Sequence, residues 1–380
     1  MWNYASTSWT TMSSDYARVA ELLSLVSADL TPYYDTHFNL LRWIQAYPGE
    51  SMEKIAQRLR HHLRFRACTW DIDSIHARER DHPIHKYWPI TFAGMSGRNC
   101  LVLYEQSGLV DYEGIHEHFS VPEIVKAKIF DAEEVLHKVM EIEKETGEQA
   151  TSMLVIDAEG VQYSKKLVEL MLGPMNSRSE FMLTHYVELV DKVVVVNFPS
   201  WAHPLWLLVK PLLPKRSREK VHIFSSSNWR EEISSVMDQS SCTVQWDKMR
   251  LDRPPRVPRL EITEPLDTLD KVHVKAGRVH WMDFCLEKGD ELEFHLTGDS
   301  SFGVSIILAE NKDDEDVSTM CTIYPLFNWI HGPFKVPLAD KIVAPVSGTY
   351  KLWLSNSRAW WSSVGIRYNV KVTKNELDEY

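Results

Sequence analysis

Two carboxylates stand at the end of a short apolar run and could act together as an acid and a base. Asp157 and Glu159 follow Met153–Ile156, which is predicted to be a buried strand. Side chains at the carboxyl end of a parallel strand lie in the crevice where α/β proteins bind ligands, and two carboxylates there could support hydrolysis. The alternative is that Asp157 accepts hydrogen bonds from turn amides while Glu159 pairs with a base. We favour this structural role and expect that the chain is not an enzyme.

Histidine and aspartate gather ahead of the first predicted strand, where they could bind a metal ion. The residues are Asp71, Asp73, His76, His82 and His85. Known zinc sites use spacings that bring three or four ligands together, whereas this spacing fits no single helix face. We therefore expect structural or surface roles for these side chains and predict neither a metal nor a cofactor.

The longest apolar segment is Trp201–Leu213, and the cationic run Lys215–Lys220 follows it. As a helix, this segment would carry apolar side chains on nearly all sides. One face would hold Trp201, Leu205, Leu208 and Leu212, with Trp206, Val209 and Leu213 covering much of the rest. Such a helix is either buried or moves between covering an apolar ligand and touching a membrane. Because Lys and Arg can bind phosphate, the pattern suits an amphiphile, and a core helix with a solvated basic end is the alternative.

The length and the net charge of the chain restrict the class of protein to which it can belong. The 380 residues predict two domains, and the net charge of −11 disfavours nucleic acid as a partner. Polar residues and prolines interrupt Trp201–Leu213, so no segment has the roughly 20 mostly apolar residues of a membrane span. The five cysteines are scattered, as is typical of reduced thiols, and residues 1–11 lack the pattern of a signal peptide. We expect a soluble, cytoplasmic protein.

The elements that must position these residues change in type along the chain. Residues 13–75 are predicted to form a helical cap, because apolar side chains recur there at helical spacing. Residues 76–250 alternate apolar β-branched runs with helical stretches, which predicts an α/β domain with a largely parallel sheet. The expected strands are Cys100–Tyr104, Met153–Ile156, Val193–Val196 and Val221–Phe224, and the expected helices span 121–145, 164–187, 201–213 and 228–238.

The remaining third of the chain predicts a different architecture. Residues 251–260 are rich in proline and form a stiff linker. Residues 261–374 contain short alternating runs such as Glu291–Leu296, separated by turns, which indicates an antiparallel β-sandwich. The acidic stretch Asp313–Asp316 is expected at a solvated hairpin tip. The predicted fold is thus multidomain, with a helical cap, an α/β domain and a β-sandwich.

Three stretches of the first 240 residues resemble the CRAL-TRIO family of lipid-transfer proteins. Asp35–Ile44 is similar to the start of the family's helical cap, and Leu154–Tyr163 to its central strand and turn. The closest likeness is Val193–Trp229, with Pro199, the Lys210-Pro211 pair and Asn228. The resemblance implies an internal hydrophobic pocket that is floored by the sheet and holds one lipid. It also implies that Trp201–Leu213 is the movable gate helix.

The resemblance also implies a site for the lipid headgroup. Phosphoinositide-binding members hold the inositol with a Glu before the gate strand and a Ser or Thr and a Lys after the gate helix. Those positions fall on Glu188, Ser217 and Lys220, whose groups can accept from inositol hydroxyls and bind phosphate. Gln45–Gly49 replaces the basic and aromatic run that the family usually has after the residue at Arg42.

Residues 261–374 resemble a GOLD domain, through Gly348–Leu352, Ser355–Ser357 and Val364–Val372. GOLD domains imply protein partners in Golgi and membrane traffic. Trp360-Trp361 is expected either at a loop tip, as an exposed contact or a membrane wedge, or in the core. The leading interpretation is a cytoplasmic carrier that binds one lipid, phosphatidylinositol or another phospholipid or isoprenoid, and presents or transfers it during transient membrane contact, at the Golgi among other membranes. The alternative is an adaptor in membrane traffic whose GOLD domain recruits a protein.

Overall fold

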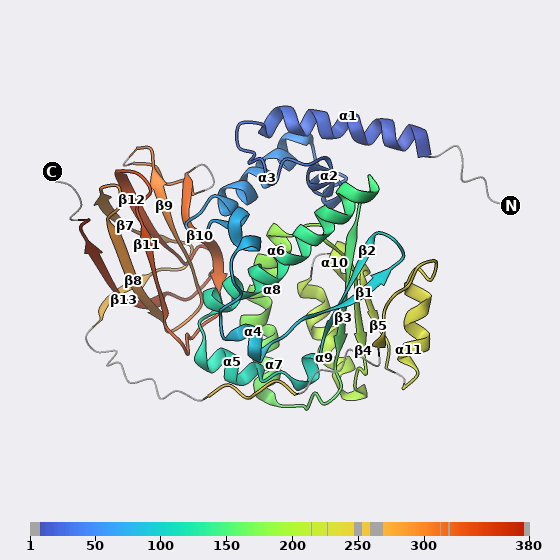
Figure 1. The fold of residues 1–380 in the computed structure, drawn as a ribbon. Coiled ribbons are helices and arrows are strands. Elements are labelled where there is room, and N and C mark those ends of the chain that lie inside the picture. The colour runs from blue at the N-terminus through green and yellow to red at the C-terminus, as the bar shows by residue number, and fades with distance from the viewer. Residues whose placement is uncertain are drawn as a thin grey trace.

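The computed structural model describes residues 8–213, 215–225, 227–246, 253–258, 269–311, 313–317 and 320–375, and side chains from residue 15 onward except that of Leu212. Figure 1 shows a helical layer along the top, an α/β part below it and a β-sandwich beside both. These parts are the helical region, the α/β domain and the antiparallel sheets that the sequence predicts. None of the described helices is long and apolar enough to cross a membrane.

The N-terminal layer consists of three helices, α1 (Ser8–Val26), α2 (His37–Ala46) and α3 (Met52–Arg66). The side chains of Thr36 and Ser51 cap α2 and α3 by accepting hydrogen bonds from backbone amides inside the first turn. Apolar side chains from all three helices join one buried cluster, which also includes Leu101 and Leu103 of the sheet and Leu136 of α6 (Val121–Thr146). The cap therefore covers one end of the α/β domain.

The α/β domain is built on a five-stranded sheet in the order β1-β2-β3-β4-β5. The strands are β1 (Thr91–Ser96), β2 (Cys100–Glu105), β3 (Thr151–Asp157), β4 (Val190–Val196) and β5 (Val221–Ile223). Strands β2 to β5 are parallel, in agreement with the sequence. The antiparallel edge strand β1 was not predicted, because Gly94 and Gly97 look like turn residues. Gly94 instead lies at an irregularity in the strand, with a φ of 129°.

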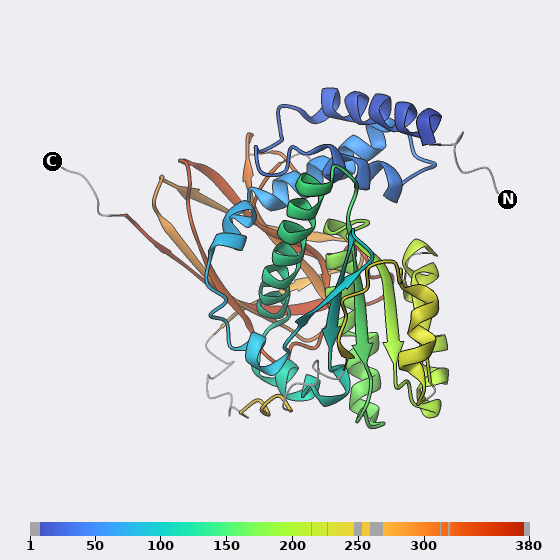
Figure 2. The ribbon, with the colours of Figure 1, turned by 45° about the vertical axis from the view of Figure 1, so that its right-hand side comes forward.

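The connections between the parallel strands place most helices on one face of the sheet. Crossovers between neighbouring parallel strands are almost always right-handed, so successive crossovers in this order cover the same face. They contain α5 (Tyr112–His118), α6, α7 (Lys165–Leu172), α8 (Pro174–His185), α9 (His203–Val209) and α10 (Lys215–Glu219). After β5, α11 (Trp229–Glu232) covers the opposite face, where Trp229 packs with Val155 and Val194. Figure 2 shows the sheet between α6, in teal, and α11, in yellow.

Three expected helices differ from the observed ones. The helix predicted over 164–187 is two helices, because Gly173 takes a non-helical conformation at φ −106° and ψ −102° and Pro174 starts α8. The segment Trp201–Leu213 forms only the short α9, flanked by the 3-10 turns η3 (Ser200–Ala202) and η4 (Lys210–Leu212), since Pro204 and Pro211 cannot donate backbone hydrogen bonds. The helix predicted over 228–238 is α11 followed by the 3-10 turn η5 (Ile233–Val236).

The C-terminal part is a β-sandwich of two four-stranded antiparallel sheets, ordered β10-β9-β12-β7 and β11-β8-β13-β6. Its strands are β6 (Asp270–Val274), β7 (Val279–Leu286), β8 (Glu291–Gly298), β9 (Phe302–Ala309), β10 (Cys321–Ile330), β11 (Leu338–Val343), β12 (Gly348–Ser355) and β13 (Val364–Thr373). The alternating run Glu291–Leu296 lies in β8, and the stretches Gly348–Leu352 and Val364–Val372 lie in β12 and β13. The acidic stretch at 313–316 lies between β9 and β10, as expected for a connecting loop.

The sandwich is packed tightly onto the helices through a core that both parts share. Phe327 of β10 stacks on Phe181 of α8, with ring centroids 4.8 Å apart. Trp70, which follows α3, meets Tyr324 edge to face at 5.6 Å. The backbone amide of Thr69 also donates to the carbonyl of Ile323 over 2.9 Å. The sandwich and the helices therefore share one continuous apolar cluster at their junction, in addition to the separate clusters of the cap and of the α/β domain.

Candidate functional site

The two faces of the central strands differ in how completely they are buried. Met153 and Val155 of β3 and Val194 and Val196 of β4 are fully buried against α11. The residues that alternate with them point to the other face, and each of these is only partly buried. They are Leu154, Ile156, Val193 and Val195. A parallel sheet covered by helices on both faces is normally buried on both, so the helices on the α6 face leave accessible apolar surface above β3 and β4.

The predicted gate segment, Trp201–Leu213, lies in the crossover between β4 and β5 and presents two different sides. Leu205 is buried and Trp206 is half-buried, whereas Leu207 and Leu208 are 67% and 59% exposed. Leu208 is therefore not buried together with Leu205, contrary to the expectation from the helical projection. The Trp201 ring meets the Tyr163 ring edge to face at 5.7 Å. Val209 is half-buried, and the side chain of Leu212 is outside the described set.

Two of the three predicted headgroup residues, Glu188 and Lys220, are in contact, and Lys220 lies at the opposite end of this crossover. The Nζ of Lys220 donates to Glu188 Oε2 over 2.6 Å and to the carbonyl oxygen of Val190 over 2.9 Å. Ser217 lies one turn before Lys220, whose amide donates to the Ser217 carbonyl. Glu188 has a positive φ of 52°, an uncommon conformation that aims its side chain from the start of β4. Each side chain of the ion pair is 20% exposed, so a ligand can reach it.

Arg216 and Tyr47 form a contact beside this pair that the sequence did not indicate. The Arg216 guanidinium lies 4.6 Å from the centroid of the Tyr47 ring and donates to the carbonyl oxygens of Ala46 and Leu183. Arg58 contacts the same ring at 4.5 Å. Tyr47 belongs to the Gln45–Gly49 segment that departs from the family pattern. Two cations therefore gather on an aromatic ring there, although the segment itself supplies none.

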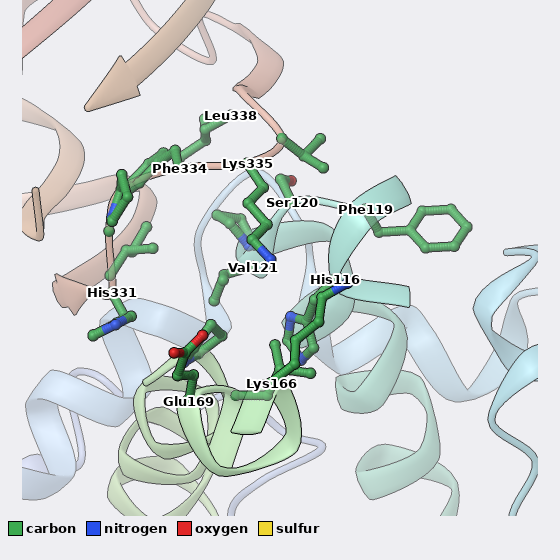
Figure 3. A pocket seen from close by; sticks show the side chains of 17 residues that line it. His116, Phe119, Ser120, Val121, Lys166, Glu169, His331, Phe334, Lys335 and Leu338 are labelled. Atoms are coloured by element: carbon green, nitrogen blue, oxygen red, sulfur yellow. The ribbon is translucent and has the colours of Figure 1, made fainter. Parts of the chain in front are cut away.

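A cavity of about 300 Å³ lies elsewhere, between the α/β domain and the sandwich. Figure 3 shows Lys335 reaching into it from the loop between β10 and β11, opposite Lys166 and Glu169 of α7. Most of the wall is apolar. It includes Phe119, Val121, Leu170, Ile330, Phe334 and Leu338. The imidazole of His116 lines the cavity as well, and burial together with the nearby cations Arg178 and Lys335 lowers its pKa to about 3, so the ring is neutral.

Asp157 has the structural surroundings that we favoured over catalysis. Its carboxylate accepts hydrogen bonds from the Tyr104 hydroxyl, the Asn197 side-chain amide and the backbone amide of Glu159. These three donors occupy both oxygens and hold the turn after β3. In the histidine-rich segment, Asp73 pairs with the buried Arg66 and His76 stacks on Tyr33. No group of three or more metal-binding side chains occurs among the described residues.

Comparison with known proteins agrees with this geometry. A sequence model of the CRAL/TRIO domain matches residues 85–247, an F28H7.8-like C-terminal domain matches 256–379, and a domain of unknown function, DUF8435, matches 12–75. The CRAL-TRIO domain-containing protein F28H7.8 of Caenorhabditis elegans is 23% identical over 82% of this chain and 79% of its own length. Protein ctg-1 of the same organism is 21% identical over 88% of this chain and 90% of its own.

Among solved structures, that of Sfh5 aligns with a TM-score of 0.47 at 14% identity, covering 64% of this chain and 93% of its own. The part of the chain that matches the CRAL/TRIO domain model, residues 85–247, contains the whole five-stranded sheet and its crossovers. Domains of this family in general bind or transfer lipids and similar small hydrophobic molecules.

Proposed function

We propose that the chain binds a single lipid against the α6 face of the sheet, beneath the gate segment, and presents or transfers it between membranes. The observation that supports this most directly is the accessible apolar surface on β3 and β4. Burying an apolar side chain stabilises a fold by about 25 cal/mol for each Å² removed from water, so a central strand that leaves such surface accessible gives up stability. An acyl or isoprenoid tail would cover it.

The gate segment fits the same role. Leu207 and Leu208 are exposed on one side of α9, while Leu205 is buried on the other. Two exposed leucines on a short helix, followed by the cationic residues of α10, can enter the interface of a membrane when the segment swings outward. The gate would then shield the tail in solution and release it at the bilayer.

Glu188, Ser217 and Lys220 are the groups that we assign to the headgroup. In the structure Lys220 and Glu188 neutralise each other, and their partial exposure leaves the remaining lone pairs and protons available. A phosphate could take over part of the Lys220 contact, and inositol hydroxyls could donate to Glu188. Arg216 supplies further positive charge, whereas the charge of Arg58 is balanced by its ion pair with Glu50. We therefore propose an anionic phospholipid, of which phosphatidylinositol is one, acting at cytoplasmic membrane surfaces such as the Golgi. The sandwich would be a GOLD-like module that takes part in membrane traffic.

The proposed lipid site on β3 and β4 can be tested by a substitution that fills it with a large side chain. Val193→Trp should place an indole over the accessible apolar surface and reduce the amount of lipid that co-purifies with the protein, measured by mass spectrometry after gentle purification. Val343→Trp is the matched control, because Val343 is 46% exposed on the sandwich. Circular dichroism establishes that both variants are folded. A folded Val193→Trp protein that retains wild-type lipid content and transfer between vesicles would contradict the proposed location.

The headgroup assignment is tested separately. Lys220→Ala should weaken the binding of an anionic phospholipid about tenfold, corresponding to about 1.4 kcal/mol, which is within the range of one charge-assisted hydrogen bond. Binding of a neutral hydrophobic ligand should change little. The control is Lys341→Ala, which removes an exposed lysine that pairs with Glu291 on the sandwich. Equal loss for both ligands would remove the headgroup role from Lys220.

A further inference from the structure

Two adjacent tryptophans stand almost entirely in solvent at the end of the sandwich. Trp360 and Trp361 lie in the loop between β12 and β13 and are 85% and 95% exposed. All other tryptophans whose side chains are described are buried or half-buried. Isolated exposed apolar residues are ordinary, but two neighbouring indoles without a packing partner form an exposed patch that needs a function.

The loop that carries them is held firmly at its base. Asn356 is buried, and its side-chain amide donates to the carbonyl oxygens of Val274 and Ser362, over 3.0 and 2.9 Å. The amide of Ala359 donates to the Asn356 carbonyl over 3.1 Å. These bonds tie both ends of the loop to β6, so the backbone is ordered before any partner arrives. Binding through a preorganised loop loses less conformational entropy.

The same loop is attached to the lipid domain. The guanidinium of Arg358 forms a two-pronged ion pair with Glu180 of α8, with N···O distances of 2.8 and 3.0 Å. Its Cζ also lies 6.0 Å from the ring of Trp329. Arg358 therefore points toward α8, whereas Trp360 and Trp361 expose their rings to solvent. The ion pair thus links the loop to α8 of the lipid domain.

We propose that Trp360 and Trp361 form a wedge that inserts into the interfacial region of a lipid bilayer. Indoles are amphipathic, with a large apolar ring and one N–H donor, and prefer the level of the lipid headgroups. Between Ala359 and Ser363 no residue is charged, so insertion carries no buried charge. A projecting tip also suits a deformable bilayer better than a protein, since aromatic anchors of protein interfaces need a matching pocket.

The net charge of the chain indicates which kind of lipid headgroup the membrane should have. With a net charge of −11, long-range electrostatics do not attract the protein to anionic lipids. The wedge should therefore bind neutral zwitterionic bilayers, and its binding should depend little on salt. This inference does not require the chain to carry a lipid, because the tip lies on the sandwich and not on the gate.

The test uses the full chain with vesicles of phosphatidylcholine. Trp360→Ser together with Trp361→Ser should lower the partition coefficient in co-sedimentation at least tenfold, at both low and high salt. The matched control is Val343→Ser with Val346→Ser, which removes two side chains, each 46% exposed, from another end of the sandwich and should leave partitioning unchanged. Lipid content after purification should be the same in all three proteins.

A second measurement distinguishes insertion from contact with a protein. Phosphatidylcholine brominated on its acyl chains should quench part of the tryptophan fluorescence of the wild type, and less in the double Trp variant. The proposal is overturned if wild type and double variant partition equally, if the control loses as much binding as the double variant, or if brominated lipid quenches both equally. It is also overturned if the wild type ignores vesicles while the tip proves necessary for binding a protein.

Discussion

Two buried histidines at the junction of the three parts should make the fold sensitive to acid. His62 of α3 and His185 of α8 are 1% and 3% exposed, and their Nδ1 atoms lie 3.3 Å apart, a hydrogen bond that requires one donor and one acceptor. Burial lowers the pKa of both rings well below the usual 6.5, and the positive charge of Arg66 and the imidazole of His61 lower them further. Both rings are therefore neutral in the folded chain.

Because the pKa of both histidines is lowered by folding, the folded state becomes less stable in acid. The unfolded chain takes up protons at these histidines as the pH falls below about 6.5, whereas the folded chain does not until far lower pH, so the free energy of unfolding falls with the pH. Between pH 7.0 and 5.5 each histidine should cost about 1.2 kcal/mol, because the full slope is about 1.4 kcal/mol per pH unit and applies only below 6.5. The pair should together cost about 2.5 kcal/mol.

Urea unfolding at pH 7.0 and at pH 5.5 measures this loss. In His185→Gln, which keeps an amide able to donate or accept, the decrease in the free energy of unfolding between the two pH values should be about 1.2 kcal/mol smaller than in the wild type. Neighbouring Arg66 is paired with Glu133 in both proteins, so its charge cancels in the comparison. His273→Gln, at an exposed position on β6, is the control. The same pH dependence in all three proteins would refute the reasoning.

Three further predictions concern the contacts between the parts. Phe327→Ala should lower the free energy of unfolding by about 3–5 kcal/mol, measured in urea, because it opens a cavity in the shared core; a loss below 1 kcal/mol would mean that the sandwich is not truly docked. Glu143→Gln leaves the buried Arg42 without its counter-charge and should cost about 3–5 kcal/mol in the same assay, whereas a neutral effect would show that water reaches Arg42. Arg216→Ala should cost about 1–2 kcal/mol and speed hydrogen exchange at the end of α2; unchanged exchange there would argue against the contact with Tyr47.

Much of the fold could be predicted from the sequence, because its patterns are local. The apolar run Val193–Val196 and the alternation in Glu291–Leu296 each indicate the right kind of strand. Strand β1 could not be predicted, since its pairing with β2 is a tertiary effect that overrides the glycines. The helix expected over 201–213 is longer than α9, because its apolar pattern suggested a continuous helix although Pro204 and Pro211 interrupt it.

The candidate site could be predicted only in part. Glu188 and Lys220 were identified through the resemblance, and the structure brings them within 2.6 Å. No local pattern links Arg216 to Tyr47, which lies far away in the chain, so this contact required the coordinates. The partial exposure of Leu154 and Val193 could not be predicted either, because a buried strand and a strand that leaves surface for a ligand have the same sequence pattern.

The shared core around Phe181 and Phe327 limits how this chain can be rearranged by recombination. A sandwich exchanged between relatives would have to bring with it side chains that fit Trp70 and α8, or both pieces would expose apolar surface. We therefore expect such modules to be inherited as a pair, with sequence changes at the junction that compensate one another. Cutting the chain between them should accordingly yield two fragments that stay associated, not two independent proteins.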